Sequence, residues 1–145
     1  MGMPETQHIN GDITRELAQT LRAGDQVLYS GIIYTARDAA HKRLVEALDA
    51  GEEPPISIDG AIIYYAGPAP AKPGYPIGPV GPTSSYRMDP YAPRLLDLGQ
   101  RAMIGKGARS QEVIDAVIRN EAVYFAAIGG AAALIAKSVK RADVV

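Results

Sequence analysis

The chain has 145 residues, the length of one domain with a core of its own. Its 15 Lys and Arg nearly balance 16 Asp and Glu, and a net charge of −1 excludes a polybasic nucleic-acid surface and an acidic tail. The sequence has no cysteine, so the chain itself supplies no disulfide, no cysteine nucleophile and no thiolate ligand for zinc or an iron–sulfur cluster. Its two histidines, His8 and His41, are too few to form a metal site alone.

Neither a membrane span nor a secretion signal is predicted. The longest apolar run, residues 122–136, contains a pair of glycines and is too short to cross a bilayer. The N-terminus lacks the basic-then-apolar pattern of a signal peptide. We therefore expect a cytoplasmic protein.

The first part of the chain alternates helix and strand. Leucines four residues apart predict a short helix over residues 15–22, and short β-rich runs predict strands over 26–29 and 32–35. Apolar residues at helical spacing then predict a helix over 39–48, with Gly51 as its stop signal.

A buried strand is predicted over residues 62–65, and a long loop follows it. Residues 67–82 are so rich in glycine and proline that a regular helix is excluded. Loops of this length inside a compact domain are usually functional or disordered, and proline at this density favours an ordered chain. We interpret the segment as a functional loop.

The second half continues the alternation of helix and strand. We expect a helix over residues 90–98, a strand over 102–104, a helix from the N-cap Ser110 to residue 118, a buried strand over 122–128, a small-residue helix over 129–137 and the start of a strand over 140–145. This order predicts a mixed α/β fold in a single domain over residues 1–145. Because the sequence stops on the apolar pair Val144 and Val145, we expect the natural protein to continue beyond it.

Three glycine-flanked segments carry polar residues that a packed core does not select. In the first, residues 31–43, a strand ends in Arg37 and Asp38 where a helix begins. A structural role accounts for Asp38 better than for Arg37, because an acidic residue favours the helix dipole at this end and a basic one opposes it. His41 lies one turn into the helix, where a structural and a catalytic role both remain open.

The second segment, residues 81–89, reads GPTSSYRMD. Its hydroxyl residues Thr83, Ser84 and Ser85 fit a helix-capping turn with a surface arginine. They fit equally a ligand site, in which hydroxyl groups donate hydrogen bonds and Arg87 grips a carboxylate with two parallel hydrogen bonds.

The third segment is Gly105-Lys106-Gly107, which follows a predicted strand. It is too short for a phosphate-binding P-loop, and it is either a plain turn or a place where the backbone approaches a ligand beside an uncrowded ammonium group. Together Arg37, Arg87 and Lys106 place three cations at strand ends or loop edges. Three cations suit a dianion such as a dicarboxylate, so the residues by themselves indicate an anion-binding site.

The sequence resembles the β subunit, or C-terminal domain, of class I iron–sulfur fumarate hydratases and of the related L(+)-tartrate dehydratases. Four stretches carry the resemblance: SGIIYTARDAAHKRL, YYAGPAPAKPGYPIGPVGPTSSYRMDPY, MIGKG and YFAAIGGAAAL. The likeness runs in one order from about Leu21 to the C-terminus, and the pair RDAAHKR and GPT-x-x-x-RMD is specific.

The resemblance implies a swivelling β/β/α domain with a mixed sheet. It also implies a [4Fe-4S] cluster whose three cysteine ligands come from a partner α subunit or domain, which agrees with the absence of cysteine here. The enzyme would be an α/β hetero-oligomer that interconverts fumarate and (S)-malate, and this chain alone would be inactive.

The resemblance also assigns roles to residues. Arg37 and Arg87 would hold substrate carboxylates, and Lys106 would add a third cation. Thr83 would be the catalytic threonine, with the substrate-binding Ser84 next to it where the family often has a second threonine. His41 matches the family motif as a further catalytic residue.

Two other functions stay open. An L(+)-tartrate dehydratase β subunit would differ only in its substrate, and a non-catalytic dicarboxylate-binding module would keep the fold without the reaction. A neighbouring gene for a protein with three spaced cysteines would favour the enzyme. Family members usually run some tens of residues past the position of Val145, which agrees with the expected continuation.

Overall fold

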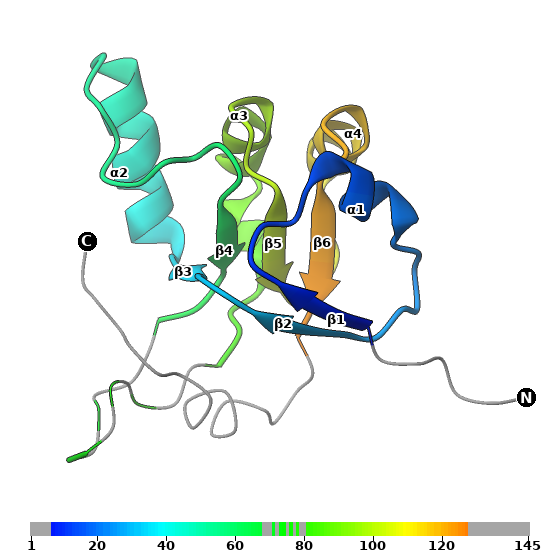
Figure 1. Ribbon diagram of the computed structural model, residues 1–145. Helices are drawn as coiled ribbons and strands as arrows, with labels where there is room; N and C mark the ends of the chain where they lie inside the picture. The colour runs from blue at the N-terminus through cyan, green and yellow to red at the C-terminus, as the bar shows by residue number, and fades with distance from the viewer. Residues whose placement is uncertain are drawn as a thin grey trace, which may run out of the picture.

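The computed structural model of the chain describes residues 7–67, 71, 73, 74, 76, 78 and 81–127. The elements follow one another as β1 (Gln7–Asn10), α1 (Arg15–Thr20), β2 (Val27–Ser30), β3 (Tyr34–Thr35), α2 (Asp38–Asp49), β4 (Ile62–Tyr64), the 3-10 helix η1 (Ser85–Met88), α3 (Ala92–Asp97), β5 (Ala102–Gly105), α4 (Gln111–Arg119) and β6 (Val123–Ala126) (Figure 1). The helix predicted over 129–137, the strand predicted over 140–145 and much of the predicted loop over 67–82 lie outside the described residues.

The main sheet has four strands in the order β3-β4-β5-β6. All three strand pairs are parallel, and the register places Ile62 opposite Ala102 and Ala102 opposite Val123. A helix connects each strand to the next, as parallel pairing requires, and Figure 1 shows α2, α3 and α4 side by side along the sheet. The expectation of an α/β fold is confirmed. Every pair of named strands in the described part is parallel, and the antiparallel pairing that a mixed sheet needs is limited there to the isolated bridge between Ala66 and Pro82.

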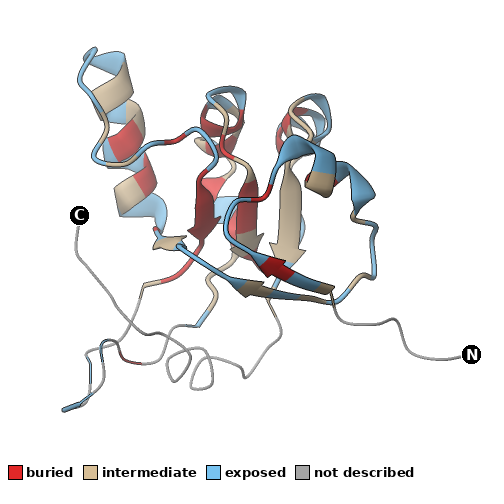
Figure 2. Cartoon of the chain, in the orientation of Figure 1, coloured by how far each residue is buried: buried red, intermediate tan, exposed pale blue. Residues whose placement is uncertain are grey.

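The helices pack on one face of this sheet. Ile63, Tyr65 and Met103 point to that face and are fully buried, against residues such as Leu95 of α3 and Val113 of α4. Figure 2 shows buried residues concentrated on β4, β5 and the helices beside them. Burial of this apolar surface is the main favourable term in folding.

A second, two-stranded parallel sheet of β1 and β2 covers the other face together with α1. Ile9, Ile13 and Ala18 of this layer pack with Ile62 and Ala102 of the main sheet. Both faces of β4 are therefore buried, and this explains its uninterrupted apolar sequence, which is typical of parallel strands. β1 was not predicted, because only Ile9 of its four residues is buried and its sequence has no apolar pattern.

Most predicted helices are confirmed, as is the predicted cap of α4, and α1 has a cap that was not predicted. Ser110 caps α4 as predicted, accepting the Val113 N–H at 3.4 Å, and Thr14 caps α1 by accepting the Leu17 N–H at 3.1 Å. The helix predicted over 90–98 is shorter than expected, because η1 and a turn precede α3. No helix within the described ranges has the length and apolar character needed to cross a membrane.

Two strand predictions need correction. The strand expected over 32–35 shrinks to the two residues of β3, and Ile32 is 75% exposed. The strand expected to be buried over 122–128 is β6, which is only partly buried and ends at Ala126. In the described part of the sheet β6 is an edge strand, so one side of it lacks a neighbour.

Candidate active site at the carboxyl edge of the sheet

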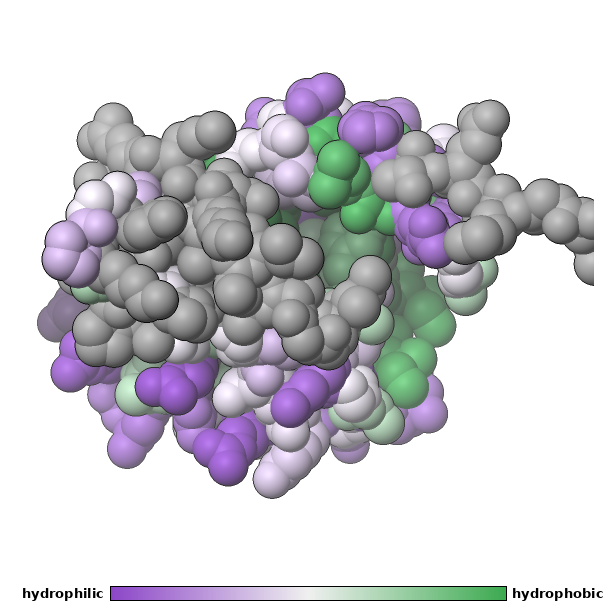
Figure 3. Space-filling model, turned by 90° about the horizontal axis from the view of Figure 1, so that it is seen from below, coloured by the Kyte–Doolittle hydropathy of each residue, from purple (hydrophilic) through white to green (hydrophobic). Residues whose placement is uncertain are grey.

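Two of the predicted site residues, Arg37 and Lys106, follow the carboxyl ends of parallel strands of the main sheet, as does Gly67. Arg37 lies two residues after β3, Gly67 three residues after β4, and Lys106 directly after β5. Ligands of open parallel α/β sheets bind outside this edge, where loops from several strands meet. Figure 3 shows the molecule from the side toward which these strands run, with hydrophilic residues along its left and lower margins and hydrophobic residues on its right.

The segment Pro82 to Ser84 lies between the extended ends of β4 and β5. Pro82 forms an antiparallel bridge with Ala66, and Ser84 forms a parallel bridge with Lys106. The Thr83 N–H donates to the Tyr65 carbonyl at 2.7 Å. These backbone contacts bring the hydroxyl groups of Thr83 and Ser84 to the same edge as Lys106, and both residues keep partial exposure.

Arg37 occupies the N-cap position of α2 and makes no side-chain capping bond. Its guanidinium lies against Gly67, where a Cβ would come within 2.6 Å of Nε and 2.7 Å of Cζ. The missing side chain of Gly67 thus leaves room for the guanidinium at the edge. Arg37 also lies at the N-terminus of α2, which is the positive end of the helix dipole. The guanidinium charge and the dipole therefore both attract an anion to this place.

Arg87 reaches the start of α2 from η1. Its Nη1 lies 4.0 Å from Oδ2 of Asp38, and both side chains are about half exposed, at 53% and 51%. At this distance the pair is not a hydrogen bond, so the guanidinium keeps its donors for a carboxylate. Among the described residues, Arg37 and Lys106 form no ion pair, and both are exposed.

His41 lies beneath this edge rather than on it. The ring is fully buried on α2, 5.4 Å from the Tyr65 ring, and its Nδ1 lies 2.9 Å from the Arg37 carbonyl. Because a carbonyl only accepts, Nδ1 carries the proton, and Nε2 has no partner within the described part of the chain. Burial lowers the pKa of His41, against the raising effect of the Arg37 carbonyl, so the ring is neutral near pH 7.

Sequence reasoning missed one group of residues at the site. Asp89 and Arg109 form a buried ion pair with 2.8 Å between Oδ1 and Nε, directly under the predicted site segments. Asp89 belongs to the RMD motif, so the sequence could have indicated it as a residue of the site. Nothing in the sequence indicated a buried role for Arg109, because a lone arginine before a helix cap is ordinarily a surface residue.

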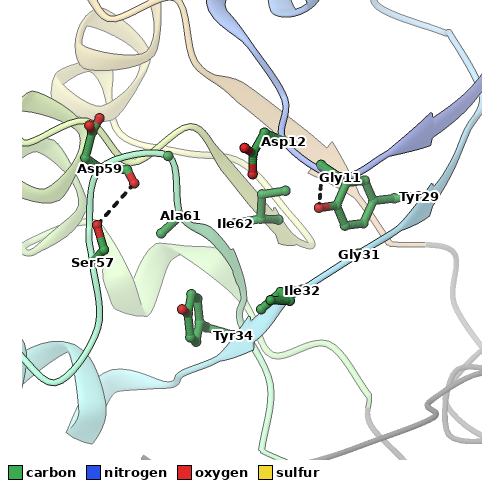
Figure 4. Close-up of a pocket in the computed structure, with 11 residues that line it drawn as sticks. Gly11, Asp12, Tyr29, Gly31, Ile32, Tyr34, Ser57, Asp59, Ala61 and Ile62 are labelled. Atoms are coloured by element: carbon green, nitrogen blue, oxygen red, sulfur yellow. Dashed lines mark hydrogen bonds between the residues drawn. The ribbon is translucent and has the colours of Figure 1, made fainter.

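A cavity of about 280 Å³ lies at the opposite edge of the sheet (Figure 4). Tyr34 and Ile62, which begin β3 and β4, line it together with Asp12 and Asp59. It contains none of the predicted site residues, so it is separate from the candidate site.

The described residues contain no group of three or more His, Asp or Glu side chains arranged to hold a metal ion. The chain has no cysteine, so it does not fit as the holder of an iron–sulfur cluster. What the edge offers is positive charge and hydroxyl groups, which are groups that bind a small carboxylate.

Comparisons with known proteins find relatives that match nearly the whole chain. The chain is 40% identical over 149 residues to "Fumarate hydratase class I, anaerobic" of Escherichia coli (strain K12), which covers 97% of this chain and 27% of that protein. It is 38% identical over 136 residues to "Fumarate hydratase 2" of Leishmania major, covering 90% of this chain and 23% of that protein. The chain thus spans about a quarter of the length of these relatives.

A third relative is closer in length. The chain is 39% identical over 134 residues to "Putative L(+)-tartrate dehydratase subunit beta" of Methanocaldococcus jannaschii, covering 90% of this chain and 69% of that protein. Residues 4–145 match the family described as "Fumarase C-terminus". The chain therefore belongs to the fumarase C-terminus family.

Proposed function

We propose that this chain is the β subunit, or the C-terminal domain, of a hydro-lyase that interconverts fumarate and (S)-malate. One observation carries the proposal: Arg37, Arg87 and Lys106 meet Thr83 at one edge of the sheet, in a chain of the fumarase C-terminus family. Fumarate and malate are dianions of a size that a few cations can hold at both ends.

The reaction explains why these residue types are needed. Dehydration of malate breaks the C3–H bond and the C2–O bond, and a proton and a hydroxide leave as water. The carbon that loses the proton is next to a carboxylate, so negative charge develops there. Arg37, Arg87 and Lys106 hold the carboxylates and stabilise that charge.

Thr83 is the proposed base for the C3 proton. A threonine hydroxyl is a weak base unless its ionised form is favoured, and nearby cations lower its pKa in that direction. The backbone N–H of Thr83 is bonded to Tyr65, so the residue has a defined place beside Lys106 and Ser84. Ser84 supplies a second hydroxyl for the substrate.

His41 acts in this proposal through Arg37. Its backbone N–H at 3.0 Å and its Nδ1 at 2.9 Å both contact the Arg37 carbonyl, and its ring is fully buried. The neutral ring therefore orients the start of α2 and, with it, the Arg37 side chain. We therefore propose a positioning role for His41, beside the catalytic role that the resemblance implies.

The proposed enzyme needs a second component, which is either a separate α subunit or another domain of the same chain. A [4Fe-4S] cluster, when bound by the partner's cysteines, would supply a Lewis acid for the substrate's hydroxyl and carboxylate. The word "subunit" in the name of the M. jannaschii relative supports a separate α subunit, whereas the long E. coli relative supports a domain of one chain. The layer order of two-stranded sheet, main sheet and helices supports the swivelling β/β/α fold expected from the sequence.

L(+)-Tartrate is the second candidate substrate. The M. jannaschii relative favours it, because the chain covers more of that protein than of the long fumarate hydratases. The comparisons do not favour a non-catalytic module, since these relatives carry enzyme names. The cytoplasmic location stays a prediction.

The deciding experiment is turnover under strictly anaerobic conditions. Fumarate hydration is measured for the chain alone, for a cysteine-bearing partner alone and for the mixture after cluster reconstitution. Activity in the mixture alone is the expected result. Turnover of tartrate without fumarate would reassign the substrate, and failure to form a complex or to turn over either acid would overturn the proposal.

A further inference from the structure

A buried ion pair lies directly behind the candidate site. Asp89 follows η1 at the end of the segment that carries Thr83 and Arg87, and Arg109 follows the turn that carries Lys106. The side chains are 14% and 3% exposed, and Asp89 Oδ1 accepts from Arg109 Nε at 2.8 Å. Asp89 Oδ2 accepts from the Ser110 N–H at 2.8 Å, so both carboxylate oxygens bind the segment that leads into α4.

The Arg109 guanidinium touches three strands or their ends. Its Nη2 donates to Tyr65 Oη at 3.1 Å, just after β4, and its Nη1 lies 3.5 Å from Met103 Sδ on β5. Its Cζ is 5.0 Å from the ring centroids of both Tyr65 and Tyr124, within cation–π range. Burial raises the pKa of Tyr65 to about 12, so that hydroxyl stays protonated at any working pH.

A second set of hydrogen bonds joins the same two segments. Tyr124 Oη donates to the Gly107 carbonyl at 2.8 Å, and the Ser85 hydroxyl therefore donates to Tyr124 Oη at 2.7 Å. Ser85 packs against Gly105, where a Cβ would overlap with Ser85 Oγ. The Ser85 N–H also donates to the Lys106 carbonyl at 2.9 Å. Segment 81–89 is thus attached to segment 105–110 at its middle, through Ser84 and Ser85, and at its C-terminal end, through Asp89.

A buried ion pair is an inefficient way to stabilise a fold, because removing two charges from water costs as much as their attraction returns. The pair is instead suited to fixing geometry. When both oxygens of a carboxylate are hydrogen-bonded, the two segments that it joins can take only one position relative to each other. Here those segments carry the proposed base and two of the three cations.

We propose that Asp89 and Arg109 are positioning residues for the active site, which fix Thr83 and Arg87 relative to Lys106. The inference rests on the proposed function, because it concerns the geometry of that same reaction. Neither residue touches the substrate. Arg37 lies outside both segments and keeps its place for one carboxylate. A small shift between the segments should therefore cost less in substrate binding than in proton transfer, which needs Thr83 within hydrogen-bond reach of the proton.

The test compares Asp89→Asn with Asp97→Asn in the reconstituted enzyme. Asp97 pairs with Arg119 through two 2.8 Å bonds, but this pair is about half exposed and joins α3 to α4 away from the site, so it is a matched control. We expect Asp89→Asn to lower kcat at least 10-fold while KM rises less than 3-fold, and Asp97→Asn to leave both within 2-fold. All rates are measured at a temperature below the thermal midpoint of each variant. They are divided by the concentration of assembled enzyme that carries the cluster.

Two further variants separate positioning from folding. Asp89→Asn leaves the charge of Arg109 buried without a partner, whereas the double variant Asp89→Asn/Arg109→Gln has no such charge. We expect the double variant to be more thermally stable than Asp89→Asn but to keep the same low kcat. If Asp89→Asn does not fold, Arg109→Lys decides, because lysine keeps a buried positive charge for Asp89 and loses the guanidinium contacts with Tyr65 Oη and Met103 Sδ. In that variant kcat should fall at least 3-fold.

Three outcomes would overturn the inference. If the wild type is active and a folded Asp89→Asn variant keeps kcat within 2-fold, the positioning role alone is overturned. Arg109→Lys takes the place of Asp89→Asn in this comparison if Asp89→Asn does not fold. A stable double variant with wild-type kcat would overturn the same role. A wild-type complex that turns over neither fumarate nor tartrate would overturn the proposed function and the inference with it.

Discussion

The guanidinium of Arg37 lies against the Cα of Gly67, with no space between them for a side chain. A Cβ on Gly67 would stand 2.6 Å from Nε and 2.9 Å from Nη2 of Arg37. The backbone of Gly67 does not occupy the left-handed region, so the residue is glycine here for space and not for its φ angle. The contact links the end of β4 to the start of α2.

Gly67→Ala should therefore disable Arg37 without unfolding the protein. The methyl group meets the mobile end of a side chain, so the free energy of unfolding should change by less than about 1 kcal/mol. A displaced Arg37 loses a charge-assisted contact worth about 1.5–3 kcal/mol, and kcat/KM should fall about 10- to 100-fold. Steady-state kinetics with fumarate measure the effect.

The control for Gly67→Ala is the same substitution in an Arg37→Ala background. If the methyl group acts by displacing Arg37, it should cause no further loss there. An additional loss in the double variant would show that Gly67 acts by another route.

Thr83→Ala tests the proposed base. The hydrogen bond from the Thr83 N–H to Tyr65 belongs to the backbone, so the variant should fold normally. Loss of a general base typically lowers the rate by about 10² to 10⁴, and we expect kcat to fall by that amount with little change in KM. Thr83→Ser keeps the hydroxyl and should retain most activity. Near-full turnover by Thr83→Ala would exclude it as the base.

Arg87→Met tests the carboxylate clamp. We expect KM to rise and kcat to fall together, because the guanidinium contacts the substrate in both the ground state and the transition state. Arg94→Met, which removes another exposed arginine paired with an aspartate, is the control and should leave both constants unchanged.

Asp38→Asn complements that test. It removes the 4.0 Å ion pair with Arg87, which is exposed and worth less than about 1 kcal/mol. Turnover should change by less than about 5-fold. A larger loss would show that Asp38 itself meets the substrate.

The burial of His41 leads us to expect that the stability of the protein depends on pH. Burial lowers its pKa in the folded protein below the ordinary value of about 6.5, so the unfolded chain binds a proton that the folded chain excludes. The free energy of unfolding should fall as the pH drops below about 6.5 toward the folded-state pKa.

His41→Gln should remove this dependence, at a cost of about 1–3 kcal/mol in stability at pH 7.5. Denaturant unfolding between pH 7.5 and 5.5 measures it, with His8→Gln as the control because His8 is exposed on β1. The same pH slope in wild type and His41→Gln would mean that other groups cause it.

Much of the local structure was predictable from the residues. The apolar runs of β4 and β5 and the Ser110 cap are local signals, since period, length and capping chemistry depend on neighbours in the chain. The cations Arg37, Arg87 and Lys106 were found in the same way, because each follows a strand or a glycine turn. Parallel pairing places Arg37 and Lys106 at one edge, whereas Arg87 reaches that edge from η1, 4.0 Å from Asp38.

Burial and pairing between distant segments were decided only by the tertiary structure. Thr83 meets Tyr65, and Arg109 meets Asp89, across 18 and 20 residues of chain, and such contacts leave no periodic pattern. The sequence by itself identified the residues that we propose as the anion site. The tertiary structure decided that His41 is buried and neutral beneath Arg37, because desolvation depends on what packs around a group and not on its position in the chain.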